Sequence, residues 1–355
     1  MPYIDETLLL DYQASEATSE LRKKPHGLVD LFAKSTASVD YIPPSVAKLM
    51  ASMNSTRNIK IPYLKDNQVV VTSVPGFDKI PVNLGESGEY YFAAFDVWSG
   101  FTMAKSTFEG NSIDAGYYFN NQMNRITQGM ASQKEIILKS VLEAQKTRLL
   151  NFTEQVSETS GDYAFDAPTD TLRIKKVAQN DTLFYNLQSL MAANDVEGEY
   201  LLATSRAALT ISSAEAMKYG VNNNKNIEWA QAYMSESNKF ESNNITTSEK
   251  WDGYLVKNGS VGMYSNYPYD FRVGSEVAGS RWFISPVEMP NLKSRPNMFT
   301  RTTAADMTGL IAGSNQIMST REEIALWDRF YVVYPVNSDP DTRVNPIVKT
   351  TALIA

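Results

Sequence analysis

The sequence predicts an α+β protein arranged around one long helix, and three observations support this prediction. Apolar residues between positions 112 and 150 recur in steps of three, four or seven, which places them on one face of a helix. Residues 58–108 alternate apolar and polar side chains between prolines and glycines, a pattern typical of strands joined by turns. Helical and strand-like patterns then alternate from residue 181, and strong apolar runs return near the C-terminus.

The helix over residues 112–150 is the longest predicted element. It contains no proline and would be about 58 Å long, whereas the usual helix has about 11–12 residues. Ser112 is a suitable N-cap. Gly129 and the capping-box-like residues 132–135 allow a bend or restart, although we favour a single straight helix. The face that we expect to be buried contains Ile113, Tyr117, Met123, Ile126, Met130, Ile137, Val141, Ala144 and Leu149.

Residues 1–57 have the pattern of an arm rather than of a domain. Short helices are predicted over 28–32 and 43–53, but no periodic apolar pattern supports an independent core. Such a segment usually lies on the body of its own chain or on a neighbour. A solvated surface is the simplest interpretation of its basic cluster, and contact with nucleic acid or an acidic partner is the alternative. The cluster consists of Arg22, Lys23 and Lys24.

Residues 58–109 form a predicted two-stranded excursion. In its return strand Phe95 and Val97 lie on one side, and Asp96 and Trp98 lie on the other. A two-stranded hairpin is marginally stable alone in water, so we expect another surface to hold it. The turn candidates are Val74, Pro75, Gly76, Phe77, Gly85 and Gly88.

The second half of the chain mixes both kinds of element. Helices are predicted over 181–193 and 207–219, around a short buried strand over 200–203. The apolar run over 322–336 predicts a central strand late in the chain. Further strands are predicted over 249–269 and 281–287, and the tail over 347–354 is apolar. An asparagine-rich loop tip contains Asn222, Asn223 and Asn224.

The composition excludes several classes of site. The 355 residues carry a formal net charge of −7, so a general nucleic-acid coat is not the first choice. The absence of cysteine excludes a disulfide framework and thiolate metal sites. His26 is the only histidine, and we expect it in a solvent-exposed loop rather than in a catalytic triad or zinc site. No apolar run is long enough for a membrane span, and the acidic N-terminus lacks the features of a signal peptide.

Motif searches give no enzymatic signal. The phosphate-binding, dinucleotide-binding and zinc-protease patterns are all missing. Ser45 and Lys48 match the bare S-x-x-K pattern of serine acyl-enzymes, but the partner motifs are misplaced or incomplete, so a helix start is preferred. Glu322 and Glu323 are an adjacent carboxylate pair, for which solvated surface is a better interpretation than glycoside hydrolysis. We therefore expect no catalytic residue, no cofactor and no metal.

Two stretches carry a resemblance to a known family. FTMAKSTFEGNSID, residues 101–114, resembles the strand-to-spine junction of tailed-phage major capsid proteins, and residues 180–219 resemble that family's helix, short strand and helix. The order of parts over nearly the whole chain is similar to the Hong Kong 97 capsid fold, which the family shares with encapsulins. The resemblance implies an N-terminal arm at 1–57, an extended two-stranded loop at 58–109, a peripheral domain with a sheet and the spine helix at 110–180, an axial α/β domain at 181–290 and a return to the peripheral domain at 291–355.

The resemblance also implies a function. Copies of the chain would self-assemble as hexamers and pentamers into the icosahedral or elongated shell of a tailed phage, which encloses double-stranded DNA without sequence-specific binding. The implied location is the virion capsid, after assembly in the cytoplasm of the bacterial host. The implied partners are portal and scaffold or auxiliary capsid proteins. Assembly contacts would come from the extended loop, the spine helix and the axial loop tip.

Two alternatives stay open at this point. An encapsulin-like compartment has the same fold but encloses protein cargo. A glycan-binding or glycan-degrading protein would use the 19 tyrosines and 15 phenylalanines as sugar platforms. The missing signal peptide argues against the glycan alternative. A scaffolding segment, which precedes the arm in many precursors of the capsid family, is not visible, so we expect a processed chain or a separate scaffold.

Overall fold

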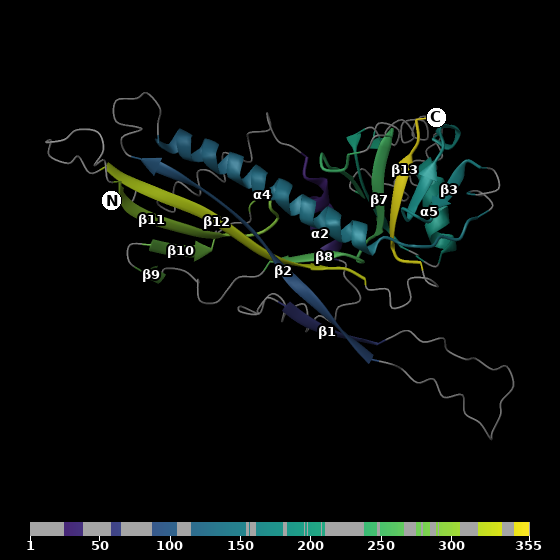
Figure 1. Cartoon of the computed structure of the whole chain (residues 1–355), viewed down its shortest axis with the longest axis horizontal. Coiled ribbons are helices and arrows are strands. Elements are labelled where there is room, and N and C mark those ends of the chain that lie inside the picture. Colours follow the sequence, from purple (N-terminus) through teal and green to yellow (C-terminus); the bar gives the residue numbers. More distant parts are fainter. Residues whose placement is uncertain are drawn as a thin grey trace, which may run out of the picture.

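A computed structural model gives the architecture of the chain (Figure 1). The predicted α+β class is confirmed, because two sheets pack against a small number of helices among the described residues. The structure describes residues 25–37, 58–64, 87–104, 115–153, 156, 161–179, 183–194, 196, 198–206, 208–209, 238–246, 249–265, 275–277, 280–284, 289, 291–305, 319–335 and 344–354.

The larger sheet has seven strands within the described parts of the chain, and all of their pairings are antiparallel. Its central strand is β12 (Ser319–Val333), which confirms the strand predicted over 322–336. β12 pairs along one side with the 18-residue strand β2 (Ser87–Ala104). The other strands are β1 (Asn58–Leu64), β8 (Gly262–Ser265), β9 (Ser275–Val277), β10 (Ser280–Ile284) and β11 (Asn297–Ala305).

The second sheet has six strands, in the order β3-β4-β13-β7-β5-β6. Its two central strands are β13 and β7, which pair antiparallel. The apolar C-terminal run therefore enters the middle of a sheet, where Ile347 and Val348 are buried. The strands are β3 (Tyr163–Asp166), β4 (Thr171–Ile174), β5 (Tyr200–Thr204), β6 (Lys239–Glu241), β7 (Trp251–Lys257) and β13 (Ile347–Ala352).

Some strands join a different sheet from the one expected from the domain ranges that the sequence suggested. Residues 163–174 and 347–352 were grouped with the long helix and the returning strand, but β3, β4 and β13 lie in the six-stranded sheet. Conversely, β8, β9 and β10 were grouped with the axial part, but they lie in the seven-stranded sheet. Alternation along a strand shows that one face is buried, but it does not show which sheet the strand joins. The exact domain boundaries remain predictions.

Helix α4 (Ala115–Gln145) is the long helix that the sequence predicts. It runs unbroken through Gly129, and Figure 1 shows it lying along the seven-stranded sheet, so the bend near Gly129 is not formed. It ends at Gln145 rather than at residue 150, because the chain leaves the helix to bind the start of β13. There the Thr147 amide donates to the Ile347 carbonyl at 2.8 Å.

The buried face of α4 is only partly the predicted one. Tyr117 is 68% exposed, which corrects the expectation that it faces the core. Nine residues separate Tyr117 from Ile126, so the two lie about 180° apart around a helix. Ala144 is exposed as well, and Ile137 is half-buried. The apolar residues of α4 that are buried are Phe119, Met123, Ile126, Met130, Ala131, Leu138, Val141 and Leu142.

The described residues form two apolar cores. The first lies between α4, the seven-stranded sheet and one side of the six-stranded sheet, and it includes the contact of Phe101 with Phe119, whose ring centroids are 5.8 Å apart. The second lies between the six-stranded sheet and helix α5 (Leu183–Ala193), with the fully buried Trp251 among its members. α5 confirms the helix predicted over 181–193, and β5 confirms the buried strand that follows it.

Helix α2 (Gly27–Thr36) belongs to the first core. The short helix predicted over 28–32 is confirmed, and Leu28, Leu31 and Phe32 are completely buried. The expectation of an exposed His26 is wrong, because its side chain is only 7% exposed. The backbone of His26 forms a β-bridge with the segment after β6, which draws the residue inside. The helix predicted over 43–53 lies outside the described residues.

The predicted two-stranded excursion is present in β1 and β2. The part of β2 from Ala94 onwards pairs with β12, whereas residues 87–93 pair only with β1 among the described strands. Figure 1 shows this pair running diagonally away from the rest of the sheet. Gly88 lies within β2 opposite Tyr63. The other turn candidates lie outside the described residues.

Two helical glycines, Gly129 of α4 and Gly27 of α2, predict opposite effects of substitution by alanine. A Cβ at Gly129 would meet nothing within 4 Å, whereas a Cβ at Gly27 would lie 2.3 Å from the Glu241 carbonyl oxygen. We expect Gly129→Ala to raise the free energy of unfolding by about 0.5–1 kcal/mol, because alanine favours helix and loses less entropy. Gly27→Ala should lower it by about 1–3 kcal/mol through overpacking. Urea denaturation of both variants checks this, and an unchanged Gly27→Ala would contradict the tight packing of α2.

Candidate functional site

Two adjacent residues of α4, Lys134 and Glu135, are both completely buried. Consecutive side chains of a helix point about 100° apart, so the two reach different parts of the molecule. Lys134 is directed to the seven-stranded sheet, and Glu135 is directed to α2 and the segment after β6. We call these two groups of contacts the sheet joint and the α2 joint.

The sheet joint centres on an ion pair. Lys134 Nζ lies 2.8 Å from Asp328 Oδ2 on β12, and the two side chains are 0% and 2% exposed. Lys134 also donates to the Leu292 carbonyl at 2.8 Å, and the Ser294 hydroxyl donates to Asp328 Oδ2 at 2.8 Å. The ammonium lies 4.6 Å from the centre of the Phe330 ring, a cation–π contact. These partners offset the cost of removing two charges from water.

The α2 joint centres on the Glu135 carboxylate. Its Oε1 accepts a hydrogen bond from the Leu28 amide at 2.9 Å, in the first turn of α2. Its Oε2 accepts from the Ser242 hydroxyl at 3.1 Å and from Asn244 Nδ2 at 2.6 Å. His26 Nδ1 lies 3.7 Å from the same oxygen. A carboxylate at a helix N-terminus is favoured by the unpaired amides and the dipole, so Glu135 caps α2 from another helix.

The capping box predicted at residues 132–135 is therefore not formed. α4 continues through these residues, and Glu135 accepts the Leu28 amide instead of an amide of its own helix. Glu135 instead caps the N-terminus of another helix, through the Leu28 amide 107 residues earlier in the chain. A local motif cannot reveal a partner so distant in the sequence.

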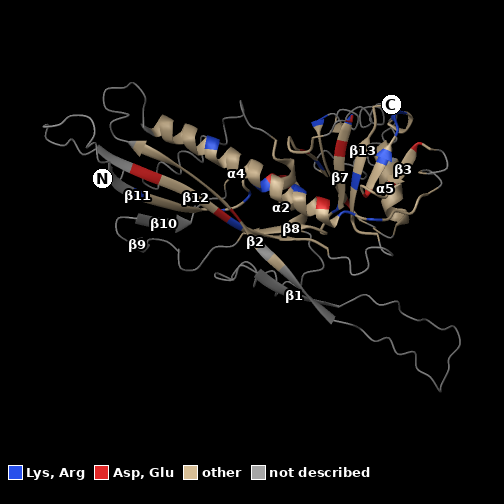
Figure 2. Cartoon of the chain, viewed as in Figure 1, with Lys and Arg blue, Asp and Glu red and all other residues tan. Residues whose placement is uncertain are grey.

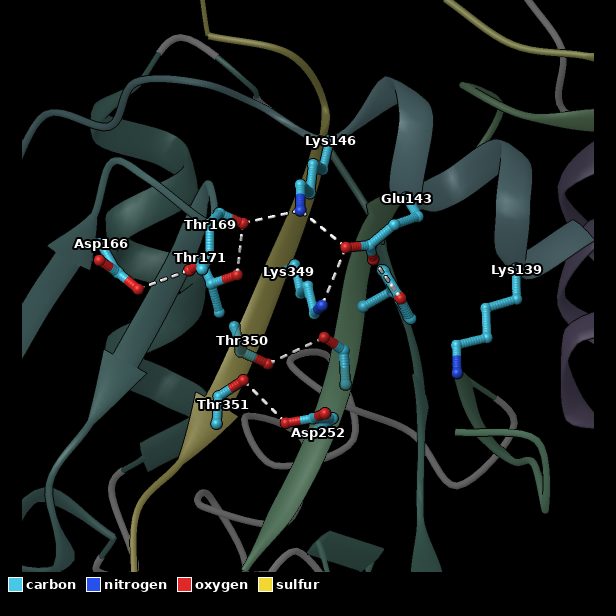
Figure 3. A network of polar contacts seen from close by, with 12 residues as sticks. Lys139, Glu143, Lys146, Asp166, Thr169, Thr171, Asp252, Lys349, Thr350 and Thr351 are labelled. Carbon is cyan, nitrogen blue, oxygen red and sulfur yellow. Dashed lines mark hydrogen bonds and ion pairs between the residues drawn. The ribbon is translucent and has the colours of Figure 1, made fainter. Parts of the chain in front are cut away.

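A third polar joint connects the end of α4 to the six-stranded sheet (Figure 3). Glu143 Oε1 accepts from Lys146 at 2.7 Å and from Lys349 of β13 at 2.9 Å, and Oε2 accepts from the Tyr254 hydroxyl of β7 at 2.6 Å. Burial alone raises the pKa of Glu143, but the hydrogen bonds from Lys146, Tyr254 and Lys349 outweigh it and lower the pKa to about 2. Burial, reinforced by the Glu143 carboxylate, raises the pKa of Tyr254.

The same joint extends to the edge of the six-stranded sheet. Lys146 donates to the Thr169 carbonyl at 2.7 Å, beyond which Thr169 donates to Asp166 at 2.6 Å (Figure 3). On the other side Thr351 of β13 donates to Asp252 of β7 at 2.7 Å. The arrangement contains carboxylates, hydroxyls and ammonium groups, but each of these groups contacts another side chain or a backbone carbonyl. It therefore serves as a structural connection.

The face of the seven-stranded sheet opposite α4 carries aromatic and charged side chains. Trp98 of β2 is 55% exposed and lies opposite Trp327 of β12 in the register. Asp96 accepts from Trp327 Nε1 at 2.9 Å and from Arg329 at 2.6 and 3.0 Å. The Arg329 guanidinium lies 4.6 Å from the centre of the Trp327 ring. This group of residues is named the tryptophan face, and it confirms the predicted direction of Trp98 and Asp96.

The carboxylate pair at 322 and 323 divides between the two faces of β12. Glu323 forms an ion pair with Arg301 at 2.5 Å on the outer face, as expected for a surface residue. Glu322 is only 7% exposed, so the expectation that it is solvated is wrong. Alternation along the strand turns every second side chain inward, whatever its polarity. Figure 2 shows acidic and basic residues side by side along α4 and β12.

Most assembly residues named from the sequence lie outside the described residues. These are the turn candidates other than Gly88, the N-cap Ser112 with Ile113, the loop tip at Asn222–Asn224 and the basic cluster at Arg22–Lys24. Ser45 and Lys48 of the S-x-x-K match also lie outside the described residues. The sequence did not single out Glu143 and Asp328, and it placed Lys134 and Glu135 only in a capping box. A signal was present at Lys134, which falls within the apolar stripe of α4, between Ala131 and Leu138.

Among the described residues no group of three His, Asp or Glu side chains is placed to bind a metal ion. Within the same part of the chain, no helix is both long and apolar enough to cross a membrane.

No protein-family model and no curated protein matches this sequence. The structure is similar to the capsid of Ralstonia phage GP4, with 8% identity, 95% of this chain and 93% of that chain covered, and a TM-score of 0.49. It is also similar to the capsid of the cyanophage P-SCSP1u, with 13% identity, 85% of each chain covered and a TM-score of 0.43. Both are phage capsids. At such low identity a similarity of fold carries no functional assignment.

The sheet joint predicts a strong asymmetry between single and double substitutions. Lys134→Met should lower the free energy of unfolding by about 3–5 kcal/mol, because Asp328 is left buried without its cation. The double variant Lys134→Met with Asp328→Leu should recover most of this loss, since an apolar pair needs no desolvation. Guanidinium denaturation of both variants measures the difference. A double variant as unstable as the single one would show that the ion pair stabilises the chain beyond avoiding an unpaired charge.

The Glu143 joint predicts a loss of stability in acid. Because the folded pKa is depressed from 4.5 to about 2, the carboxylate contributes stability above pH 4.5, and this contribution is lost as the pH falls towards 2. Its side chain is 38% exposed, so we expect only about 1 kcal/mol. Glu143→Gln should flatten the dependence of unfolding free energy on pH in this window. Glu323→Gln is the control on an exposed pair, and an equal effect of both variants would contradict the assignment.

Proposed function

We propose that this chain is a structural subunit that assembles with copies of itself into a closed shell. The observation that supports this most directly is the extension formed by β1 and the first half of β2. Residues 87–93 of β2 pair only with β1 among the described strands, so this ribbon has two strands. An isolated two-stranded ribbon is marginal in water and becomes stable when a further surface covers it. A neighbouring copy of the same chain supplies such a surface in a symmetric assembly.

The body of the chain also presents side chains suited to protein contacts. Trp98 on the tryptophan face is 55% exposed, and Tyr117 and Ile136 on α4 are 68% and 49% exposed. Tryptophan and tyrosine are enriched among the side chains that contribute most of the binding energy in protein interfaces. They lie on elements whose positions are fixed by buried joints, which lowers the entropic cost of forming a contact.

We extend the proposal to the major capsid protein of a tailed phage. The order of a two-stranded extension, a long helix on an antiparallel sheet and a second sheet with its own helix supports it, together with the sequence resemblance. In this proposal hexamers and pentamers of the chain form an icosahedral or elongated shell, which encloses double-stranded DNA without reading its sequence. Portal and scaffold or auxiliary capsid proteins are the further partners. The shell forms in the cytoplasm of the bacterial host and becomes the virion capsid.

The proposal assigns no catalytic step to the chain. The polar groups described above are engaged in joints between elements, and each carboxylate in them accepts hydrogen bonds or pairs with a cation. A subunit with this role performs its function through shape, contacts and stability. The alternative proposal, an encapsulin-like shell, involves the same assembly of subunits and differs from a phage capsid in enclosing protein cargo instead of DNA.

Shortening the extension tests the proposal. Leu64 and Ser87 are register partners, so residues 65–86 can be replaced by an Asn-Gly turn without changing the pairing of β1 with β2. We expect the variant to remain folded, with a melting temperature within a few degrees of the unmodified chain, but to form no shells by negative-stain electron microscopy. Normal shells from the shortened chain would contradict the proposal, and so would a stable monomer of the unmodified chain with a scaffold partner supplied.

A further inference from the structure

Helix α2 lies between the two sheets. It contacts β8 of the seven-stranded sheet, β5 and β6 of the six-stranded sheet, and α4. Figure 1 shows it close to α4, at the position where the two sheets approach each other. Its charged side chains face both ways, because Asp30 pairs with Lys293 at 3.3 Å and Lys34 pairs with Glu199 at 3.8 Å. α2 therefore packs between the two sheets and links them.

Polar contacts from other segments fix both ends of α2. At its N-terminus the Leu28 amide donates to Glu135, as described for the α2 joint. At its C-terminus Ser35 Oγ accepts from the Gly259 amide at 2.9 Å, and Thr36 Oγ1 accepts from the Met263 amide at 2.8 Å. None of these contacts comes from a neighbouring residue of the chain. The position of α2 thus depends on α4, on the turn between β7 and β8, and on β8 itself.

The N-terminus of α2 is held by a side chain of another helix rather than by a side-chain cap of its own. His26, at the N-cap position, makes no side-chain capping bond. Its ring is 7% exposed, and neither ring nitrogen has a hydrogen-bond partner among the described residues. The Glu135 carboxylate is 3.7 Å away, and it is the group that joins α2, Ser242 and Asn244. Loss of this one carboxylate releases three contacts together.

Each sheet keeps an apolar core of its own without α2. The core between the six-stranded sheet and α5 contains no residue of α2. In the first core, the N-terminal half of α4 packs on β2 through Phe119 and Phe101. The sheet joint of Lys134 with Asp328 also involves no α2 residue. A ten-residue helix is not stable alone in water, so α2 would unfold once it leaves this seat.

We propose that α2 opens as a separate unit, with the Glu135 carboxylate as its catch, while α4 and both sheets stay folded. Opening exposes Leu28, Leu31 and Phe32 and removes one of the two links between the sheets. The two sheets then turn relative to each other about the end of α4, where the contacts of Glu143 with β7 and β13 remain closed. This inference concerns the single chain and does not depend on shell assembly. It assigns to residues 25–37 a role in changing the shape of the subunit, in addition to filling the core.

Thiol labelling of the full-length chain tests the opening directly. The natural sequence has no cysteine, so a single introduced thiol gives no background. Leu31→Cys reports α2, and Leu326→Cys in β12 is the control, since both side chains are 0% exposed. We expect the α2 thiol to react with a disulfide reagent at least about tenfold faster than the β12 thiol under native conditions, because local opening requires less free energy than global unfolding. Equal rates for the two thiols would overturn the proposal.

Hydrogen exchange tests the role of the catch without introduced thiols. Glu135→Gln keeps the shape of the side chain and removes its charge, and Glu143→Gln makes the same change about two turns later on α4. Glu135→Gln should speed amide exchange over residues 28–36 and 239–244 by about tenfold or more, and leave residues 119–130 and 324–330 within about twofold. Glu143→Gln should leave α2 unchanged. Equal acceleration of all segments by Glu135→Gln would show that α2 opens only when the whole chain unfolds, and would overturn the proposal.

Discussion

The position of α4 depends on two adjacent buried charges, Lys134 and Glu135. Hydrophobic burial is not directional, so an apolar helix face tolerates small rotations and shifts with little loss. A buried ammonium or carboxylate does not, because the loss of its partner leaves an uncompensated charge in a medium of low polarity. Lys134 fixes the helix against β12, and Glu135 fixes α2 and the segment after β6 against the helix. The two charges together set the rotation of α4 and its height over the sheet.

The remaining architecture follows from this fixed helix. The seven-stranded sheet packs beneath it, and its C-terminal end reaches the six-stranded sheet through Glu143 and two strands, β7 and β13. Both sheets contribute to the first apolar core, the second lies between the six-stranded sheet and α5, and α2 and α4 contact both sheets. Such a division gives rigid parts joined at a few defined polar contacts. It suits a subunit whose proposed role requires constant local shape and a limited adjustment between its parts.

The fold was predictable where the pattern is local. The long helix, the helix α5, the buried strand β5 and the late central strand β12 all follow from apolar periodicity, because each element buries one face regardless of its partner. The polar joints were not predictable, since Glu135 caps a helix 107 residues away and Asp328 is paired across 194 residues. His26 shows the same limit: a Pro-His-Gly sequence is typical of an exposed loop, but the bridge to Ser242 buries it. A charge inside an apolar stripe, as at Lys134, is the one local sign that such a partner exists.

β2 connects the outside of the molecule to its centre within one unbroken strand. Its 18 residues span roughly 60 Å when extended, from the pair with β1 to the end of the pair with β12. In that pairing Val97 lies opposite Asp328, the residue that binds Lys134 of α4. A force on the extension therefore acts along the strand axis and loads many ladder hydrogen bonds in shear at once, so none of them carries it alone. β2 is thus a continuous connection between the extension and the centre of the molecule. A displacement of the extension along the strand reaches the long helix without an intervening loop.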